Sequence, residues 1–108
     1  MKVAVMTDVP YYLNKLREVA DERGVEIALC ASVDSIPPEV DRIFVDLSAT
    51  TFDPIQAISS AKAIRNTPIT AFVSGVQIDM RERAEKAGAD EVLPRSILVE
   101  RIEDALRI

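Results

Sequence analysis

The sequence predicts an α/β fold in which a parallel sheet carries helices on both faces. Short apolar runs rich in β-forming residues alternate along the chain with longer segments whose apolar residues recur at helical spacing. Proline and glycine mark the ends of most of these segments. Because strands and helices alternate, a parallel sheet with helices on both sides is the most economical arrangement.

The expected strands are short; the first is continuously apolar, as is typical of a strand buried on both faces of a sheet, and the second alternates at first. They cover residues 3–6, 25–30, 41–47, 69–73 and 91–93. Each run is followed by a turn or a helix signal, which sets its length.

Four helices are expected. The first begins at Pro10 and ends before Gly24, a natural C-cap. The second has Asp53 as its N-cap, the third covers residues 77–87, and Ser96 can cap the last. The spacing of the second helix predicts one buried apolar face: Ile55, Ile58, Ala61 and Ile64.

The connection over residues 31–40 contains Pro37-Pro38, and the residue before a proline avoids the α region. No full helix is therefore expected there, and at most one turn. Ten residues reach at most ~33–36 Å, which is enough to return along a strand and cross to the next position in the sheet.

Composition limits the possible functions. The 108 residues suit one domain, residues 1–108, and the net charge of -5 argues against a nucleic-acid partner. No apolar run approaches the roughly 20 residues that span a membrane, and the start of the chain is charged too soon for a signal peptide. A cytoplasmic protein is expected.

The single cysteine, Cys30, lies in an apolar run and is interpreted as a buried core thiol.

Polar residues follow several of the expected strands. Thr7 and Asp8 follow the first, and Asp46 stands near the end of the third. Ser74 follows the fourth strand and Arg95 the fifth. Because the carboxyl ends of parallel strands meet at one edge, these side chains should converge there. Two carboxylates can hold Mg²⁺, one of them can form an acyl phosphate, and a hydroxyl and a cation can hold phosphoryl oxygens.

Three stretches of the sequence resemble receiver domains of two-component signalling, the CheY-like family. Residues 2–10 resemble the opening strand with its acidic end, residues 41–48 resemble the strand that ends at the phosphoacceptor, and residues 87–93 resemble the approach to the last strand. The last stretch is the most specific. The resemblance covers nearly the whole chain. It implies a flavodoxin-like three-layer sandwich with strand order 2-1-3-4-5, in which the second helix is reduced or absent.

The resemblance also implies roles for individual residues. Asp46 would be the phosphoacceptor, and Mg²⁺ would be held by Asp8, Asp46 and the carbonyl of Ser48. Ser74 would contact the phosphoryl group through its hydroxyl, and Arg95 through its charge.

Three positions depart from the family pattern. Thr7 stands where the family usually has a second acid, which weakens the expected Mg²⁺ site. Arg95 stands where the family has lysine, and the two side chains differ in length and shape. Val92 replaces an aromatic residue that usually couples the phosphorylation site to the output face.

Simpler interpretations remain open for several of these residues. Asp8 could cap the first helix, and Arg95 could form a structural ion pair with Asp46 in place of a metal. Tyr11 and Tyr12 are interpreted as packing residues of the first helix.

Three functions are compatible with the sequence. The first is a receiver that accepts a phosphoryl group on Asp46 from a histidine kinase and signals through protein contacts. The second is a pseudo-receiver that binds another signalling protein without phosphorylation. The third is a small flavodoxin-like enzyme that binds a nucleotide or cofactor, which the sequence disfavours because no phosphate-binding loop follows the first strand. No enzymatic activity is therefore expected.

Overall fold

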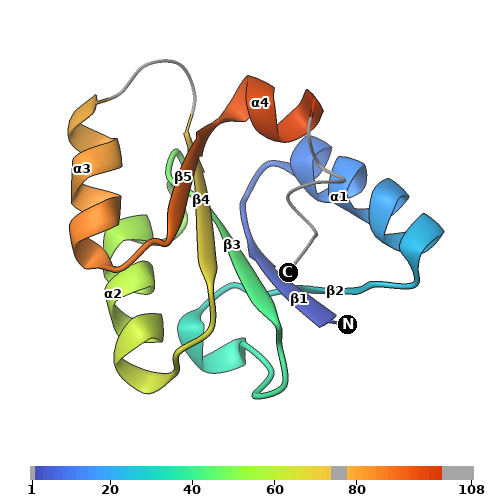
Figure 1. The fold of residues 1–108 in the computed structure, drawn as a ribbon, viewed down its shortest axis with the longest axis horizontal. Helices are drawn as coiled ribbons and strands as arrows, with labels where there is room; N and C mark the ends of the chain where they lie inside the picture. The colour runs from blue at the N-terminus through green and yellow to red at the C-terminus, as the bar shows by residue number, and fades with distance from the viewer. Residues whose placement is uncertain (1, 74–77, 101–108) are drawn as a thin grey trace.

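The computed structural model describes residues 2–73 and 78–100, and it confirms the predicted fold class. Five parallel strands form one sheet in the order β2-β1-β3-β4-β5 (Figure 1). The strands are β1 (Lys2–Met6), β2 (Glu26–Leu29), β3 (Arg42–Asp46), β4 (Ile69–Val73) and β5 (Glu91–Pro94). The helices are α1 (Pro10–Arg23), α2 (Pro54–Ile64), α3 (Ile78–Ala87) and α4 (Arg95–Glu100), with a 3₁₀ turn η1 (Val33–Ser35).

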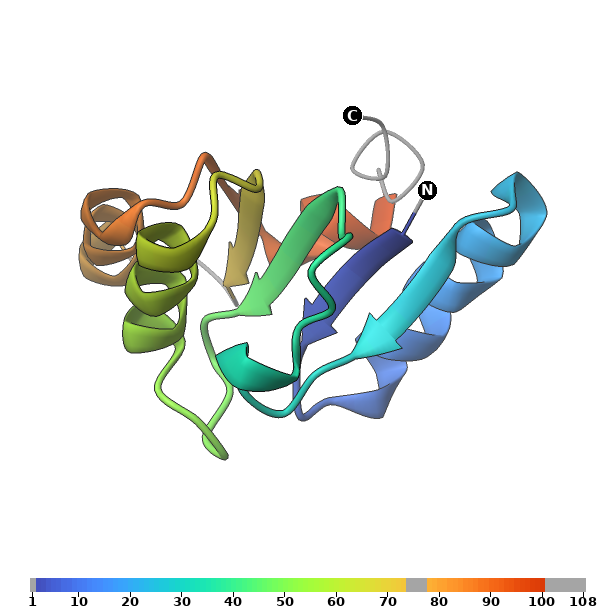
Figure 2. The ribbon, with the colours of Figure 1, turned by 90° about the horizontal axis from the view of Figure 1, so that it is seen from below.

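The elements form three layers. Helices α2 and α3 cover one face of the sheet and α1 covers the other (Figure 2). Helix α4 continues from the end of β5 toward the side of α1 (Figure 1). The fold thus brings α4 and α1 together beside the carboxyl ends of the strands.

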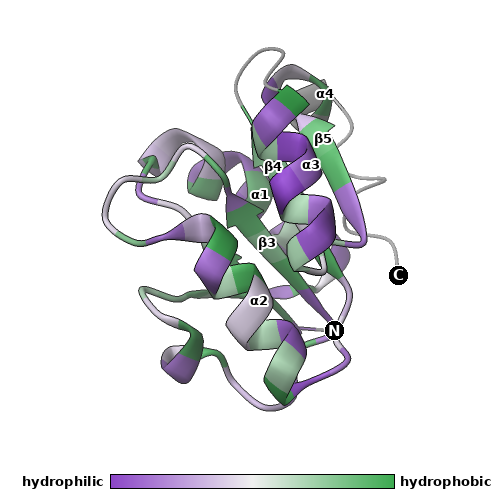
Figure 3. Ribbon diagram, turned by 90° about the vertical axis from the view of Figure 1, so that its left-hand side faces the viewer, coloured by the Kyte–Doolittle hydropathy of each residue, from purple (hydrophilic) through white to green (hydrophobic). Residues whose placement is uncertain are grey.

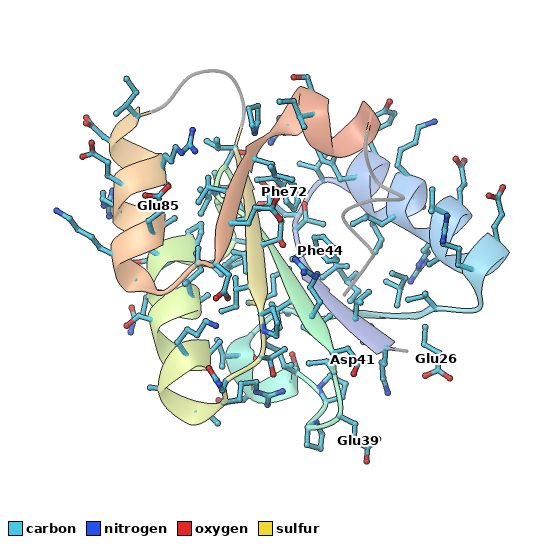
Figure 4. The ribbon with its side chains drawn as sticks, viewed as in Figure 1. Glu26, Glu39, Asp41, Phe44, Phe72 and Glu85 are labelled. Atoms are coloured by element: carbon cyan, nitrogen blue, oxygen red, sulfur yellow. The ribbon has the colours of Figure 1, made fainter. Side chains whose placement is uncertain are left out.

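Alternation along the strands divides the core into two clusters. In β3, Ile43 and Val45 pack in the cluster under α2 and α3, whereas Phe44 packs in the cluster under α1. Phe72 of β4 belongs to the α1 side as well, and Figure 4 shows both rings within the fold. Because side chains alternate between the faces of a strand, Asp46 lies on the same side as Phe44, toward α1.

The helix ends follow the predicted signals, with two exceptions. Asp53 accepts a hydrogen bond from the Gln56 amide (3.1 Å), and Gly24 closes α1 with φ 71°. Ile64 was expected on the buried face of α2 but is 66% exposed, because it is the last residue of the helix. Ser96 does not cap α4: β5 runs directly into a helix that begins at Arg95, so Ser96 lies within its first turn.

The connection between β2 and β3 contains only the single turn η1, as the two prolines predict. Arg65, which follows the last residue of α2, holds this connection in place because it donates a hydrogen bond to the carbonyl of Pro37 (2.8 Å). Cys30 at its start is 3% exposed, as expected of a core thiol. Burial raises the pKa of the Cys30 thiol, which keeps it in the unreactive protonated form.

The outer layer is amphipathic. In Figure 3 the apolar strand β3 lies behind α2, while α3 presents many hydrophilic residues outward. Arg81 and Glu85 on α3 form an exposed ion pair one turn apart (3.2 Å). Within the described part of the chain, no helix combines the length and the apolar character that crossing a membrane requires.

Candidate functional site

The carboxyl ends of the strands bring four of the predicted site residues to one edge of the sheet. Asp8 follows β1, Asp46 ends β3 with Ser48 just beyond it, and Arg95 begins α4 directly after β5. Neighbouring strands β1 and β3 run parallel, so their ends lie next to each other. Ser74, the fifth predicted residue, lies outside the described residues.

Asp46 is the centre of this edge. Its side chain is 0% exposed, and both carboxylate oxygens accept hydrogen bonds from the chain itself. Oδ2 accepts from the Thr7 hydroxyl (2.8 Å), and Oδ1 accepts from the Ser48 amide (2.9 Å) and the Ser48 hydroxyl (2.7 Å). A buried carboxylate is tolerated only when such donors replace water. The local sequence Asp-Leu-Ser supplies two of these donors by turning back just after the strand ends.

Arg95 provides the counter-charge. Its Nη2 lies 3.5 Å from Oδ1 of Asp46 and also donates to the hydroxyl of Ser48. The structural ion pair considered from the sequence is thus confirmed. The Arg95 side chain is 24% exposed, so this pair is largely shielded from water. Its Nε is buried and finds no hydrogen-bond acceptor among the described residues.

The aromatic ring of Tyr12 covers the guanidinium. The Cζ atom of Arg95 lies 4.5 Å from the centroid of the ring, a cation–π arrangement. Arg95 is therefore held between the carboxylate of Asp46 on β3 and an aromatic side chain on α1.

Asp8 has a different set of partners. Its Oδ2 accepts hydrogen bonds from the amides of Thr50 (2.8 Å) and Thr51 (3.2 Å), and from the Thr50 hydroxyl (3.3 Å). The Thr50 amide lowers the pKa of Asp8 most, desolvation opposes it, and the Thr51 amide lowers it further. The interpretation of Asp8 as a helix cap is wrong: the N-cap of α1 is Val9, and no side chain caps that end. Asp8 instead fixes the loop that follows β3.

The arrangement does not fit the Mg²⁺ ion that the resemblance implies. Both oxygens of Asp46 and the Oδ2 of Asp8 already accept hydrogen bonds within the chain, and the positive charge of Arg95 lies beside Asp46. Among the described residues, no group of three or more Asp, Glu, His or Cys side chains could hold a metal. The guanidinium of Arg95 beside Asp46 also repels a second cation at this edge.

Sequence reasoning missed the roles of two residues. Thr7 is expected at this edge, but as a missing acid and not as a donor, whereas its hydroxyl donates directly to Asp46. Tyr12 was treated as a packing residue, yet it covers Arg95. The position of Thr7 at the end of the first strand was a usable signal, whereas nothing in the sequence connects Tyr12 to a residue more than eighty positions away.

Comparison with known proteins supports the fold. No family model matches the sequence, and no curated protein matches it. Solved structures match closely in shape at low identity. A response regulator from Burkholderia pseudomallei, solved with a phosphorylated aspartic acid, a calcium ion and citrate, has a TM-score of 0.83 at 21% identity; the match covers 98% of this chain and 66% of that one.

Two further structures span almost the whole of both chains. A two-component response regulator from Clostridium difficile has a TM-score of 0.81 at 18% identity, with 99% of this chain and 96% of that chain covered. The chemotaxis protein CheY4 from Vibrio cholerae has a TM-score of 0.82 at 15% identity, with 97% and 94% covered. This chain therefore has the CheY-like fold of response-regulator receiver domains, as its sequence predicts.

Proposed function

We propose that this chain is a signalling module with the receiver fold that acts through protein contacts and does not depend on phosphoryl transfer to Asp46. The environment of Asp46 carries this proposal. Its carboxylate is fully buried, hydrogen-bonded at both oxygens and paired with Arg95. A phosphoacceptor must meet its donor in line and needs a metal beside it to balance the incoming charge. Asp46 already has a fixed counter-ion and no open approach.

The neighbours of Asp46 support the same proposal. Thr7 contributes a hydroxyl that donates to Asp46, not an acid that could bind a cation. Asp8 is engaged with the loop at Thr50 and Thr51. The buried carboxylate of Asp46 is stable without an ion, because groups of the chain donate to both of its oxygens.

A second candidate is a receiver that does accept a phosphoryl group in a two-component phosphorelay. The convergence of Asp46, Ser48 and Arg95 at the carboxyl edge favours it. The Burkholderia protein of the same fold carries a phosphorylated aspartic acid. In this version Asp46 accepts the phosphoryl group, Ser74 and Arg95 contact its oxygens, and Mg²⁺ binds Asp8, Asp46 and the Ser48 carbonyl. It requires Arg95 and Asp8 to leave their present partners.

Both versions place the chain in the cytoplasm with another signalling protein as its partner. In the second version that partner is a histidine kinase. The net charge of -5 supports a protein partner over a nucleic acid, since phosphate backbones require a basic surface.

The two versions are separated by adding Mg²⁺ with beryllofluoride, and separately with a small acyl phosphate, while amide NMR shifts and intact mass are recorded. We expect no shift and no added mass in the native chain. A shift or a phosphate adduct that is absent from Asp46→Asn would overturn the proposal and establish the second candidate.

A restored variant provides the matched control. Thr7→Asp combined with Arg95→Lys returns the two family residues to the site and creates room and charge for Mg²⁺. We expect this double variant to bind beryllofluoride under conditions in which the native chain does not, which would show that these two positions cause the difference.

A further inference from the structure

A chain of side-chain contacts joins the buried carboxylate of Asp46 to the surface of α1. Arg95 stands 3.5 Å from Asp46 on one side and 4.5 Å from the ring centroid of Tyr12 on the other. Tyr12 in turn meets Tyr11 edge to face, with ring centroids 5.4 Å apart and planes at 82°. Tyr11 is 53% exposed. Three contacts therefore lead from a fully buried charge to solvent.

The guanidinium has few other restraints, which makes it sensitive to both neighbours. Apart from Asp46 it donates only to the Ser48 hydroxyl among the described residues, and its Nε has no acceptor there. Its position therefore depends on the attraction of the carboxylate and on the face of the Tyr12 ring. A change in the charge of Asp46 alters the attraction between Arg95 and the carboxylate, but it leaves the attraction between Arg95 and the Tyr12 ring unchanged.

The Tyr12 ring packs at the edge of the core on the side of α1. It is only partly buried, and its remaining aromatic contact within the core is Phe72, at a centroid distance of 5.7 Å. Tyr11 beyond it has Lys15 over its ring at 5.7 Å. Displacement of Arg95 therefore changes a contact of the ring that Tyr11 meets edge to face.

We propose that Arg95 and Tyr12 form a relay that reports the charge of Asp46 at the exposed ring of Tyr11 on α1. This goes beyond the function proposed above, because it identifies where the state of Asp46 is displayed. It holds whether that state is changed by phosphorylation or by a bound partner. The relay begins when a group bound at Asp46 competes with Arg95, and it ends in a changed orientation of Tyr11.

The composition of the chain makes this relay directly measurable. The sequence contains two tyrosines, Tyr11 and Tyr12, and no tryptophan. Tyrosine fluorescence and the tyrosine bands of near-ultraviolet circular dichroism therefore report only on the two rings of the relay. Far-ultraviolet circular dichroism monitors folding independently.

The test removes the charge of Asp46 in two backgrounds. Asp46→Asn is made first with Tyr12→Phe, which keeps a ring against Arg95 and leaves Tyr11 as the sole reporter. It is then made with Tyr12→Leu, which interrupts the relay. We expect Asp46→Asn to change the Tyr11 emission in the Phe background and to lose most of that change in the Leu background.

Controls make the result decisive. Arg42→Gln changes an arginine at the opposite end of β3 and should leave the tyrosine signals as in the native chain. If Asp46→Asn does not fold, Arg95→Lys in the same two Tyr12 backgrounds replaces it, since it keeps the positive charge but removes the guanidinium that contacts both Asp46 and the Tyr12 ring. The relay is overturned if folded Asp46→Asn leaves the Tyr11 emission unchanged in the Phe background, or if the Tyr11 response is equal in the Phe and Leu backgrounds. Neither outcome bears on beryllofluoride binding, so it leaves the proposed function intact.

Discussion

The two buried polar side chains of the described core lie on adjacent strands: Asp46 is at the carboxyl end of β3, and Thr70 is nearer the amino end of β4. Both are 0% exposed. Thr70 accepts a hydrogen bond from Arg42 and donates to Glu91 (3.4 Å). Asp46 is held by Thr7, Ser48 and Arg95. Each end thus combines a buried polar group with an arginine, yet the groups differ in charge.

The difference in charge changes what the surroundings must provide. Thr70 is neutral, and the ion pair beside it reaches solvent, since the Glu91 side chain is 48% exposed. Asp46 carries a charge that water does not reach, so donors from three separate segments must stay in place. The comparison teaches that the polar contacts at the amino end of the sheet are structural, whereas the contacts at the carboxyl end connect β1, β3 and α4 through one buried carboxylate.

The largest expected effect comes from removing the two arginines. Arg95→Met should lower the free energy of unfolding by about 3 kcal/mol, because it leaves a buried charge without its counter-ion. Arg42→Met should lower it by only about 1 kcal/mol, because it leaves a neutral hydroxyl that still has Glu91. Urea unfolding of both variants measures the difference.

A double variant sharpens this comparison. Asp46→Asn should recover much of the stability lost in Arg95→Met, because no uncompensated charge then remains buried. Equal losses in the two arginine variants, with no recovery in the double variant, would mean that the two ends are equivalent.

A smaller effect is expected from the two threonines, which form a matched pair. Thr7→Val and Thr70→Val each replace a hydroxyl by a methyl group of similar size. Thr7 donates to a carboxylate, so its loss should cost about 2 kcal/mol, whereas the loss of Thr70 should cost about 1 kcal/mol. Thermal or urea unfolding distinguishes these values, and the reverse order would contradict the proposed contrast.

The smallest effect is expected from two exposed aspartates, one at each end of the sheet. Asp8 is held by loop amides, and its pKa is lowered. The pKa of Asp90 is also lowered: desolvation alone would raise it, but it is outweighed by the hydrogen bond from Lys62 (2.7 Å), the Ile69 amide and the nearby positive charges.

Both carboxylates therefore stabilise the fold above their ordinary pKa of 3.8, and this stability is lost as the pH falls through the lower folded-state values. Acid unfolding curves of Asp8→Asn and Asp90→Asn should each be flatter than that of the native chain. High salt should reduce the contribution of Asp90 more, because its ion pair is screened while the backbone hydrogen bonds of Asp8 are not. If salt reduced the contributions of Asp8 and Asp90 to stability equally, the two carboxylates would not differ in this way.

The fold could be predicted because its signals are local and repeated. Apolar runs, Gly24 and Asp53 mark the elements, and the resemblance supplied the strand order. The two errors have local causes: Ile64 lies where α2 ends, and no loop residue separates β5 from the helix that contains Ser96.

The candidate site could be predicted only as far as the topology determines it. Parallel strands bring Asp46 and Arg95 to one edge, so their pairing could be considered from the sequence. The partners of Asp8 depend on how the loop at Thr50 and Thr51 turns, and the position of Tyr12 depends on how α1 sits against α4. Both are set by tertiary packing, which no spacing in the sequence encodes.

The complete burial of Asp46 also has a kinetic consequence. A reagent that modifies this carboxylate can react only during transient openings of the carboxyl edge. When the reagent is abundant, the rate of modification should reach a plateau set by the frequency of opening, independent of reagent concentration. The rate at which Asp46 is modified would then measure how often the carboxyl edge of the sheet opens.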